Sequence, residues 1–245
     1  MPADPVRIRA VLFDLGGTLI DERDFAGWTD LAREVGVEVL PDGLAHAFAE
    51  VDGALDREPL ALSGTAAMVE RWRRILALAS GRRVPTETAD RFVALRAPGE
   101  DHPVSLYSDV RRCLDQLRSE RRRLGVVSNS VSEARVRRLL ERVGILGYFE
   151  PVVSSGTEGV AKPDPEIFRR ALSKLSVEPP EALYVGNLVR TDVLAARRAG
   201  LHAVWLHRDG TGLGDDPPEI TSLLEVPLVV GQLEAPSRTD GPAHR

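Results

Sequence analysis

The spacing of hydrophobic residues divides this chain into segments with different periods. Residues 7–15 predict a buried strand, in which an apolar run over residues 10–13 leads to Asp14. A glycine pair follows and is typical of a tight turn. From residue 21 to residue 102 the apolar positions instead recur at helical spacing. Glycines and prolines divide this stretch, and the sequence predicts four helices, over residues 24–35, 42–56, 64–80 and 86–97.

After residue 103, helical and strand-like segments alternate. Short apolar runs predict strands over residues 124–128, 151–154, 182–186 and 203–206. Amphipathic segments predict helices over residues 106–120, 131–143, 164–175 and 190–199. Alternation of this kind builds a parallel sheet with helices on both faces, and right-handed crossovers place the carboxyl ends of the strands at one edge. The predicted fold class is therefore α/β, with a Rossmann-like, three-layer α/β/α core.

The helical stretch interrupts this alternation directly after the first strand. We expect one core built from residues 1–20 and 103–231, and an α-helical cap domain built from residues 21–102. An insert at this point would lie above the sheet edge that carries Asp14. Residues 1–6 predict a loose start, and the polar residues 232–245 predict a disordered tail.

Composition limits the classes of function. The net charge of -5 argues against bulk electrostatic binding to nucleic acid or to an anionic membrane. We find neither a signal peptide pattern nor an apolar run near the roughly 20 residues of a membrane span, so we expect a cytoplasmic protein. Cys113 is the single cysteine, which excludes an internal disulfide, fits a reducing compartment and predicts a buried structural thiol. The sequence does not indicate an oligomeric state.

Two predicted strands end in side chains suited to anion chemistry. Asp14 ends the first, and a carboxylate there can act as a nucleophile or a cation ligand, although a lone Asp before glycines usually only begins a turn. Ser128 ends the second, followed by Asn129 and Ser130. The Ser128 hydroxyl and the N–H groups after it can hold an oxyanion. The same three residues also make a good helix cap.

Lys162 stands out because the chain contains thirty arginines and only two lysines. A compact ammonium can be required where a phosphate or carboxylate must be contacted. Pro163 restrains Lys162 to an extended conformation, while Asp164 and Pro165 suit the start of the next helix. The segment predicts an ammonium held rigidly near Asp14; an ordinary helix start with a surface lysine is the alternative.

The strand over residues 182–186 is followed by Asn187 and, one helical turn later, by Asp192. Both side chains are expected to face Asp14. Oxygen ligands of this kind suit Mg²⁺, which is usually bound through one or two carboxylates and several waters. The alternative is that Asp192 only complements the positive end of its helix.

In this order, the four segments resemble the motifs of the haloacid dehalogenase superfamily of aspartate-nucleophile hydrolases, and the resemblance covers most of the chain. Asp14-Leu15-Gly16-Gly17-Thr18 is similar to the first motif, D-x-D-G-T, and Ser128 to the hydroxyl residue of the second. Lys162 matches the lysine of the third motif, and Gly186 to Asp192 resembles the fourth, G-D-x-x-x-x-D. A helical cap after the first motif is found in one phosphatase-like subclass.

The resemblance implies Mg²⁺-assisted hydrolysis of a small phosphorylated metabolite. Asp14 would attack phosphorus and form an aspartyl-phosphate, while Ser128 and Lys162 hold the phosphoryl oxygens. Thr18 would orient the Asp14 loop, and Asn129 would contact the substrate. The implied metal ligands are Asp14, the main-chain carbonyl of Gly16, Asn187 and Asp192.

Two positions depart from the family pattern. Gly16 stands where the phosphatases carry an acid/base Asp, a kind of group commonly worth about 10²–10⁴ in rate, so we expect a preference for acyl or aryl phosphates. Asn187 replaces the first Asp of the fourth motif, so we expect weak Mg²⁺ binding that tightens when a phosphate arrives.

These departures leave two alternative functions open. The superfamily's 2-haloacid dehalogenases also lack the second Asp and work without metal, although the spacing from Gly186 to Asp192 resembles the phosphatase form. A catalytically degenerate member that binds a ligand or a protein is the other alternative.

Overall fold

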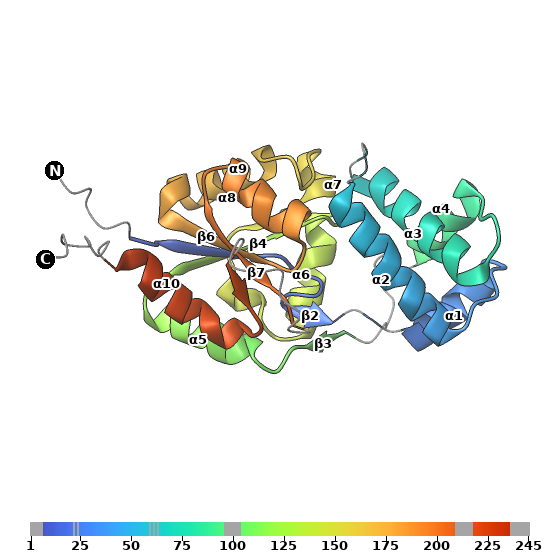
Figure 1. The fold of residues 1–245 in the computed structure, drawn as a ribbon, viewed down its shortest axis with the longest axis horizontal. Coiled ribbons are helices and arrows are strands. Elements are labelled where there is room, and N and C mark those ends of the chain that lie inside the picture. The colour runs from blue at the N-terminus through green and yellow to red at the C-terminus, as the bar shows by residue number, and fades with distance from the viewer. Residues whose placement is uncertain are drawn as a thin grey trace, which may run out of the picture.

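The fold is built around one parallel sheet with a group of helices at its end (Figure 1). The computed structural model describes residues 7–21, 23, 25–58, 60, 62, 64–95, 104–208 and 218–235. The first six residues and the tail from residue 236, for which disorder was expected, lie outside these ranges.

The sheet has six strands in the order β5-β4-β1-β6-β7-β8, and every pairing is parallel. The strands are β1 (Ala10–Phe13), β4 (Arg123–Ser128), β5 (Val152–Ser154), β6 (Ala182–Gly186), β7 (His202–Leu206) and β8 (Glu219–Ile220). Their apolar residues are buried on both faces, as expected for a parallel sheet covered by helices. The predicted α/β fold is confirmed, and β1 lies centrally between β4 and β6.

Helices cover both faces of this sheet (Figure 1). α5 (Val110–Ser119), α6 (Glu133–Arg142) and α10 (Val226–Glu234) share one hydrophobic cluster with the sheet. α8 (Glu166–Leu175) and α9 (Ala195–Arg198) belong to a second cluster on the opposite face. The short helices are α7 (Ser155–Glu158), η1 (Leu146–Tyr148), η2 (Pro179–Glu181) and η4 (Leu223–Glu225).

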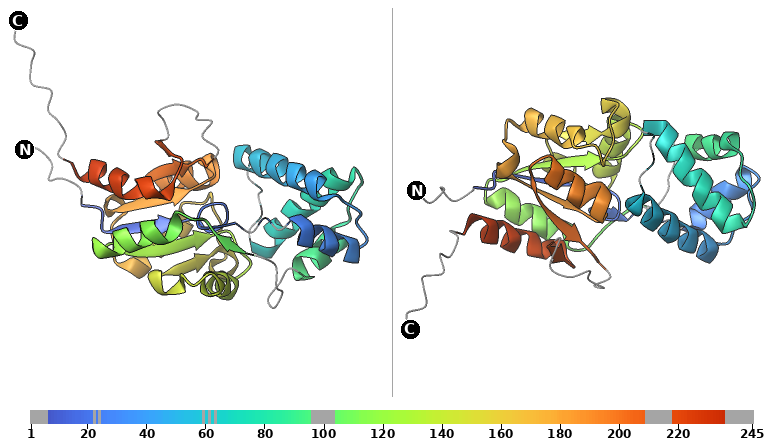
Figure 2. Two further views of the ribbon diagram at one scale, coloured as in Figure 1. Left: turned by 90° about the horizontal axis from the view of Figure 1, so that it is seen from below. Right: turned by 45° about the horizontal axis from the view of Figure 1, so that its top comes forward.

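The remaining helices form a separate group, which we call the helical region. It comprises α1 (Phe25–Glu34), α2 (Pro41–Arg57), α3 (Gly64–Ser80) and α4 (Thr86–Leu95), close to the four expected helices. Its own hydrophobic cluster is centred on Trp28, Trp72 and Phe92. Both views of Figure 2 show this region at one end of the sheet.

Two predicted segments differ from the structure. The helix expected over residues 106–120 begins only at Val110, because Ser105–Leu106 forms strand β3, which pairs antiparallel with β2 (Ile20–Asp21). The disordered tail expected from residue 232 is wrong for its first residues, because α10 continues to Glu234. The Glu234 carboxylate accepts hydrogen bonds from the Ile8 N–H at 2.8 Å and from Arg122 Nη2 at 2.9 Å, which hold the end of this helix in place.

Cys113 lies on α5 and is 1% exposed, which confirms the expected buried thiol. Burial raises the pKa of its thiol to about 12. In the parts of the chain that the structure describes, every helix is too short or too polar to cross a membrane.

Candidate active site

The ammonium of Lys162 joins two carboxylates at the carboxyl edge of the sheet. Lys162 Nζ lies 2.6 Å from Asp14 Oδ1 and 2.7 Å from Asp192 Oδ1. The side chains of Lys162 and Asp192 are only 2% and 1% exposed, so this ion cluster is shielded from water. Lys162 thus joins two residues from distant parts of the chain, which their positions after predicted strands had placed at one edge of the sheet.

Asp14 follows β1, where its main-chain N–H donates to Val185 O at 2.9 Å and so ties it to the neighbouring strand. Its side chain is 11% exposed. Burial raises the pKa of Asp14 to about 6, against the lowering effect of the Lys162 ammonium and with a further raising effect from Asp192. The carboxylate is therefore partly desolvated before any ligand arrives, which favours a nucleophile over a surface charge.

Asn129 fixes the loop that carries Lys162. Its amide Nδ2 donates to Lys162 O at 2.8 Å, and its Oδ1 accepts from the Lys162 N–H at 2.9 Å. Asp164 Oδ1 accepts from the Glu166 N–H at 2.9 Å and so supports the start of α8. Although burial lowers the pKa of Lys162, Asp14 and Asp192 outweigh that effect, and the pKa ends above its ordinary value. Lys162 therefore stays an ammonium.

Tyr184 is a member of this cluster that the sequence did not indicate. Its hydroxyl accepts from Lys162 Nζ at 3.0 Å and lies 3.1 Å from Asp192 Oδ1 and 3.3 Å from Val127 O. Burial raises the pKa of Tyr184 well above its ordinary value, so the phenol keeps its proton for these contacts. A tyrosine inside a buried apolar strand gives no signal by periodicity, because its partners come from other strands and loops.

Asp192 lies on a turn of π-helix, η3 (Val189–Leu194), where the sequence predicted the first half of an ordinary helix. Its second oxygen, Oδ2, accepts from the Leu188 N–H at 3.0 Å. Gly186 makes room for this carboxylate, because a Cβ at that position would lie 2.6 Å from Asp192 Oδ2. Widened helical turns of this type are frequent at functional sites.

Asn187 packs against the turn that follows Asp14. Gly17 has a φ of +77°, and a Cβ there would lie 2.6 Å from Asn187 Nδ2. Thr18 is fully buried, its Oγ1 is 3.5 Å from Asn187 Oδ1, and its carbonyl accepts from Arg208 Nη2 at 2.7 Å. These contacts hold Thr18 between Asn187 and Arg208, and its role in orienting the Asp14 loop stays a prediction.

The donors on this edge suit a hard cation in part. The Asp14 carboxylate, the Asn187 amide and the Gly16 carbonyl offer the oxygen atoms that Mg²⁺ prefers. Asp192 differs, because Lys162, Tyr184 and the Leu188 N–H contact its two oxygens. Two carboxylates and one ammonium leave a single net negative charge, so the residues fit a weakly held Mg²⁺. All four metal ligands remain predictions.

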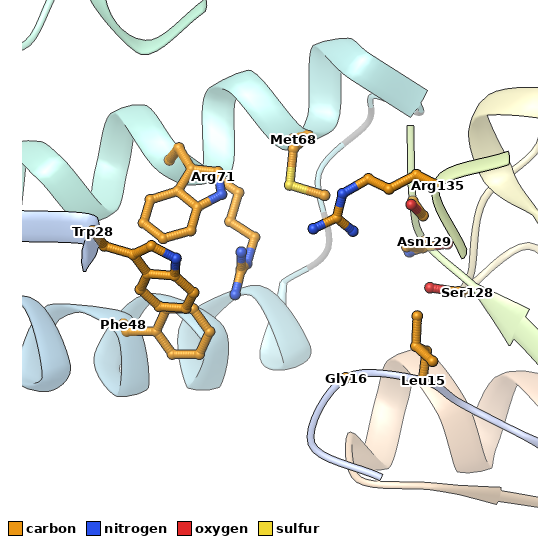
Figure 3. A pocket seen from close by; sticks show the side chains of 11 residues that line it. Leu15, Gly16, Trp28, Phe48, Met68, Arg71, Ser128, Asn129 and Arg135 are labelled. Atoms are coloured by element: carbon orange, nitrogen blue, oxygen red, sulfur yellow. The ribbon is translucent and has the colours of Figure 1, made fainter. Parts of the chain in front are cut away.

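A pocket that opens to solvent lies between this edge and the helical region. Leu15, Gly16, Ser128, Asn129 and Ser130 line its floor, whereas Trp28, Phe48, Met68, Arg71 and Trp72 come from the helical region. Figure 3 shows Arg71 and Arg135 approaching the same space from opposite walls. Arg135, on the core helix α6, is a lining residue that the sequence did not single out.

The end of α2 also contacts the turn that carries Asp192. Asp56 Oδ1 accepts from the main-chain N–H groups of Arg190 at 2.8 Å and Thr191 at 2.9 Å. Arg190 Nη1 in return donates to the carbonyl of Arg57 at 2.6 Å. The helical region is thereby attached to η3 by three hydrogen bonds.

Residues 8–200 match the family model of haloacid dehalogenase-like hydrolases. The chain is 37% identical over 121 residues to a phosphoserine phosphatase of Thermus thermophilus, a match that covers 49% of this chain and 47% of that protein. It is 29% identical over 225 residues to a glyceraldehyde 3-phosphate phosphatase of Methanothermobacter thermautotrophicus, covering 88% of this chain and 93% of that protein.

Solved structures show the same architecture. A HAD phosphatase from Thermococcus onnurineus superposes with a TM-score of 0.62 at 27% identity, over 93% of this chain and 100% of that chain. A 2-haloacid dehalogenase from Pseudomonas syringae superposes with a TM-score of 0.61 at 24% identity, over 92% of this chain and 99% of that chain. The second likeness concerns the fold alone.

Proposed function

The chain belongs to the haloacid dehalogenase-like hydrolases, and on that premise we propose that it is a phosphatase of small phosphorylated metabolites with Asp14 as its nucleophile. One observation carries the proposal: the buried ammonium of Lys162, 2.6 Å from the Asp14 carboxylate. A cation in this position offsets the charge of the nucleophile and of an incoming phosphoryl dianion together. The phosphatase names of the two relatives described above support the same activity.

In the proposed reaction, an Asp14 oxygen forms a bond to phosphorus while the bond from phosphorus to the leaving oxygen breaks. Asp14 Oδ2 is the oxygen that Lys162 does not hold, so it is the attacking atom. The Ser128 hydroxyl and the Asn129 N–H would hold phosphoryl oxygens, whereas the Ser130 N–H donates to Ser128 O at 3.0 Å. Water then attacks phosphorus, breaks the aspartyl-phosphate bond and releases inorganic phosphate.

Gly16 limits which leaving groups the enzyme can expel. The position has no side chain to protonate the departing oxygen, so substrates whose leaving group is stable as an anion are favoured. Acyl phosphates and aryl phosphates meet this condition, whereas simple alkyl phosphates do not. The Gly16 carbonyl remains available as a metal ligand.

Mg²⁺, when bound, would supply positive charge to the phosphoryl oxygens. Asp14, the Gly16 carbonyl and Asn187 would hold it, and Asp192 is the fourth proposed ligand. Because only one net negative charge is present, affinity for the cation is expected to rise when a phosphorylated substrate adds its own charge. Thr18 and Asn187 hold the loop on which Asp14 and Gly16 lie.

We further propose that the helical region is a cap domain over this site. Closing it over the pocket would exclude water from the reaction and place the substrate against Trp28 and Phe48. Asn129, predicted to contact the substrate, lines the same pocket and also fixes Lys162.

The test is phosphate release from acetyl phosphate and p-nitrophenyl phosphate, with Mg²⁺ and with EDTA, for the wild type and Asp14→Asn. The leaving groups of both substrates depart readily without protonation by an acid. The two substrates therefore do not need the acid/base side chain that Gly16 lacks. Release that requires Mg²⁺ and disappears in Asp14→Asn supports the proposal. Equal release by both proteins would remove Asp14 from the role of nucleophile.

A metal-independent 2-haloacid dehalogenase is the second candidate, which Gly16 and Asn187 favour. In that reaction Asp14 would attack carbon and expel halide, and water would cleave the resulting ester. Chloride release from 2-chloropropionate in EDTA tests it. Tight ligand binding with no turnover in either assay would instead indicate a binding module.

A further inference from the structure

The pocket beside Asp14 has a second charged feature beyond the phosphoryl site. Among the described residues that line it, the two charged ones are both arginines, Arg71 and Arg135. They come from different parts of the chain, α3 in the helical region and α6 in the core. A ligand held at Ser128 therefore extends into a space with an arginine side chain on both walls.

Arg71 is held in a fixed position. Its Nε and Nη2 donate to the two carboxylate oxygens of Asp52 at 2.7 and 2.8 Å, and its guanidinium lies 4.5 Å from the centre of the Phe48 ring. The Asp52 carboxylate offsets much of its charge. Arg71 thus acts mainly as part of a rigid wall with Phe48 and the neighbouring tryptophans.

Arg135 occupies the opposite wall. Figure 3 shows its side chain reaching toward Met68, across the opening between the helical region and Ser128. The next two arginines on α6, Arg137 and Arg138, are exposed. Arg135 differs from them because it lines the pocket.

We infer that Arg135 is a specificity-determining residue that binds a second anionic group of the substrate. The inference rests on the proposed phosphatase function and narrows it to phosphorylated carboxylic acids. The phosphoryl group would lie at Asp14 and Ser128, the apolar body against Phe48 and Met68, and the carboxylate at Arg135. A guanidinium suits a carboxylate because its planar N–H groups match the two oxygens.

A matched pair of substrates tests this charge requirement. 4-Carboxyphenyl phosphate and 4-carbamoylphenyl phosphate have nearly the same shape and an aryl leaving group, but only the first carries a second negative charge. We expect the wild type to show a KM about tenfold lower for the carboxylate, the effect of one charge-assisted hydrogen bond, and a smaller difference in high salt. Equal KM values would overturn the inference while leaving the phosphatase function intact.

Arg135→Gln is expected to raise the KM of the carboxylate about tenfold, with little change in kcat for either substrate. Arg138→Gln, an exposed arginine on the same helix, is the matched control and should preserve the preference. A preference that survives Arg135→Gln would assign the second anion to another residue.

A binding measurement separates failure of this inference from failure of the proposed function. Titration of 4-carboxybenzylphosphonate and 4-carbamoylbenzylphosphonate into wild-type protein needs no turnover. If neither phosphate ester is hydrolysed but the carboxylated phosphonate binds about tenfold more tightly, and loses this advantage in Arg135→Gln, the subsite stands and the phosphatase proposal fails. Equal affinities for the two phosphonates would overturn the subsite.

Discussion

Asp56 and Arg190 contact each other across 134 positions of sequence: the Asp56 carboxylate accepts the Arg190 N–H at 2.8 Å. Asp56 belongs to α2 of the helical region, whereas Arg190 belongs to η3, the turn that also carries Asp192. The position of the helical region and the geometry of the candidate site therefore depend on a shared set of hydrogen bonds.

Asp56→Ala tests this attachment. The change removes Asp56 Oδ1, the oxygen that accepts from the Arg190 and Thr191 N–H groups. A hydrogen bond to a charged group contributes about 1.5–3 kcal/mol. We expect kcat/KM to fall about three- to tenfold and the radius of gyration from small-angle scattering to increase. Glu50→Ala, at an exposed position on the same helix, should leave both unchanged. An unchanged scattering profile and rate for Asp56→Ala would show that other contacts hold the region.

Lys162→Met removes the cation between Asp14 and Asp192. We expect a loss of at least a hundredfold in phosphate release, because the nucleophile and the phosphoryl group both lose their compensating charge. Breaking a buried ion pair also costs about 3–5 kcal/mol of unfolding free energy, measurable by urea titration. Lys174→Met is a close control, because Lys174 is the only other lysine and pairs with Glu158 at the surface at 2.6 Å. This change should have little effect on phosphate release or on the unfolding free energy. Retained activity in Lys162→Met would contradict its role.

Tyr184→Phe removes one hydroxyl that contacts Lys162, Asp192 and Val127. We expect a loss of about 1–2 kcal/mol in unfolding free energy and a severalfold fall in kcat, because the ammonium loses one of its three partners. Tyr148→Phe removes a hydroxyl that contacts Asp115 at the surface and serves as the comparison. Identical kcat values for wild type and Tyr184→Phe would limit Tyr184 to a packing role.

Gly16→Asp should extend the substrate range. The backbone at Gly16 does not have a positive φ, so a side chain can be placed there without the strain that Gly17 would impose. We expect faster turnover of alkyl phosphates, by about tenfold or more, since a carboxyl group would protonate the leaving oxygen. Gly16→Asn adds nearly the same bulk without an acid, and an equal gain in that variant would exclude acid catalysis as the cause.

Asp109 makes the fold sensitive to acid. Burial raises its pKa, but hydrogen bonds from Arg208, the Leu223 N–H and Ser222 outweigh this and leave the pKa below its ordinary value of 3.8. A lowered folded-state pKa means that the stabilisation is present above about pH 4 and is lost as the pH falls through the folded value. Asp109→Asn should therefore have a lower unfolding free energy than wild type at pH 7. In urea titrations, this difference in unfolding free energy should become smaller below pH 4. A difference in unfolding free energy that does not depend on pH would show that ionisation of Asp109 does not cause the loss of stability.

The sequence predicted the main elements because their signals are local. The buried strands read as apolar runs, and the helices showed their 3.6-residue period. It missed the pairing of Ile20 with Leu106, since a two-residue strand has no period to detect. It also placed an ordinary helix where the π-helical turn of Asp192 begins.

At the candidate site, the position of a residue in the chain was easier to predict than its contacts. Asp14, Lys162 and Asp192 each belong to a sequence motif, and the structure brings all three together. Tyr184 and Arg135 had no such signal, because their importance arises from long-range packing around a strand and a pocket. For Asn129, the sequence indicated a substrate contact but gave no indication of its two bonds to the Lys162 backbone.

The central place of β1 in the sheet has a consequence for how the chain matures during synthesis. β1 emerges from the ribosome before the other described strands, yet its neighbours are β4 and β6, made from residues 123–128 and 182–186. The hydrophobic cluster of the helical region lies wholly within residues 25–95, so it can assemble before β4 and β6 are available to pair with β1. Asp14 is translated before the helical region, but Lys162 and Asp192 are translated after it. A nascent chain stalled before β6 would expose an unpaired apolar strand to aggregation.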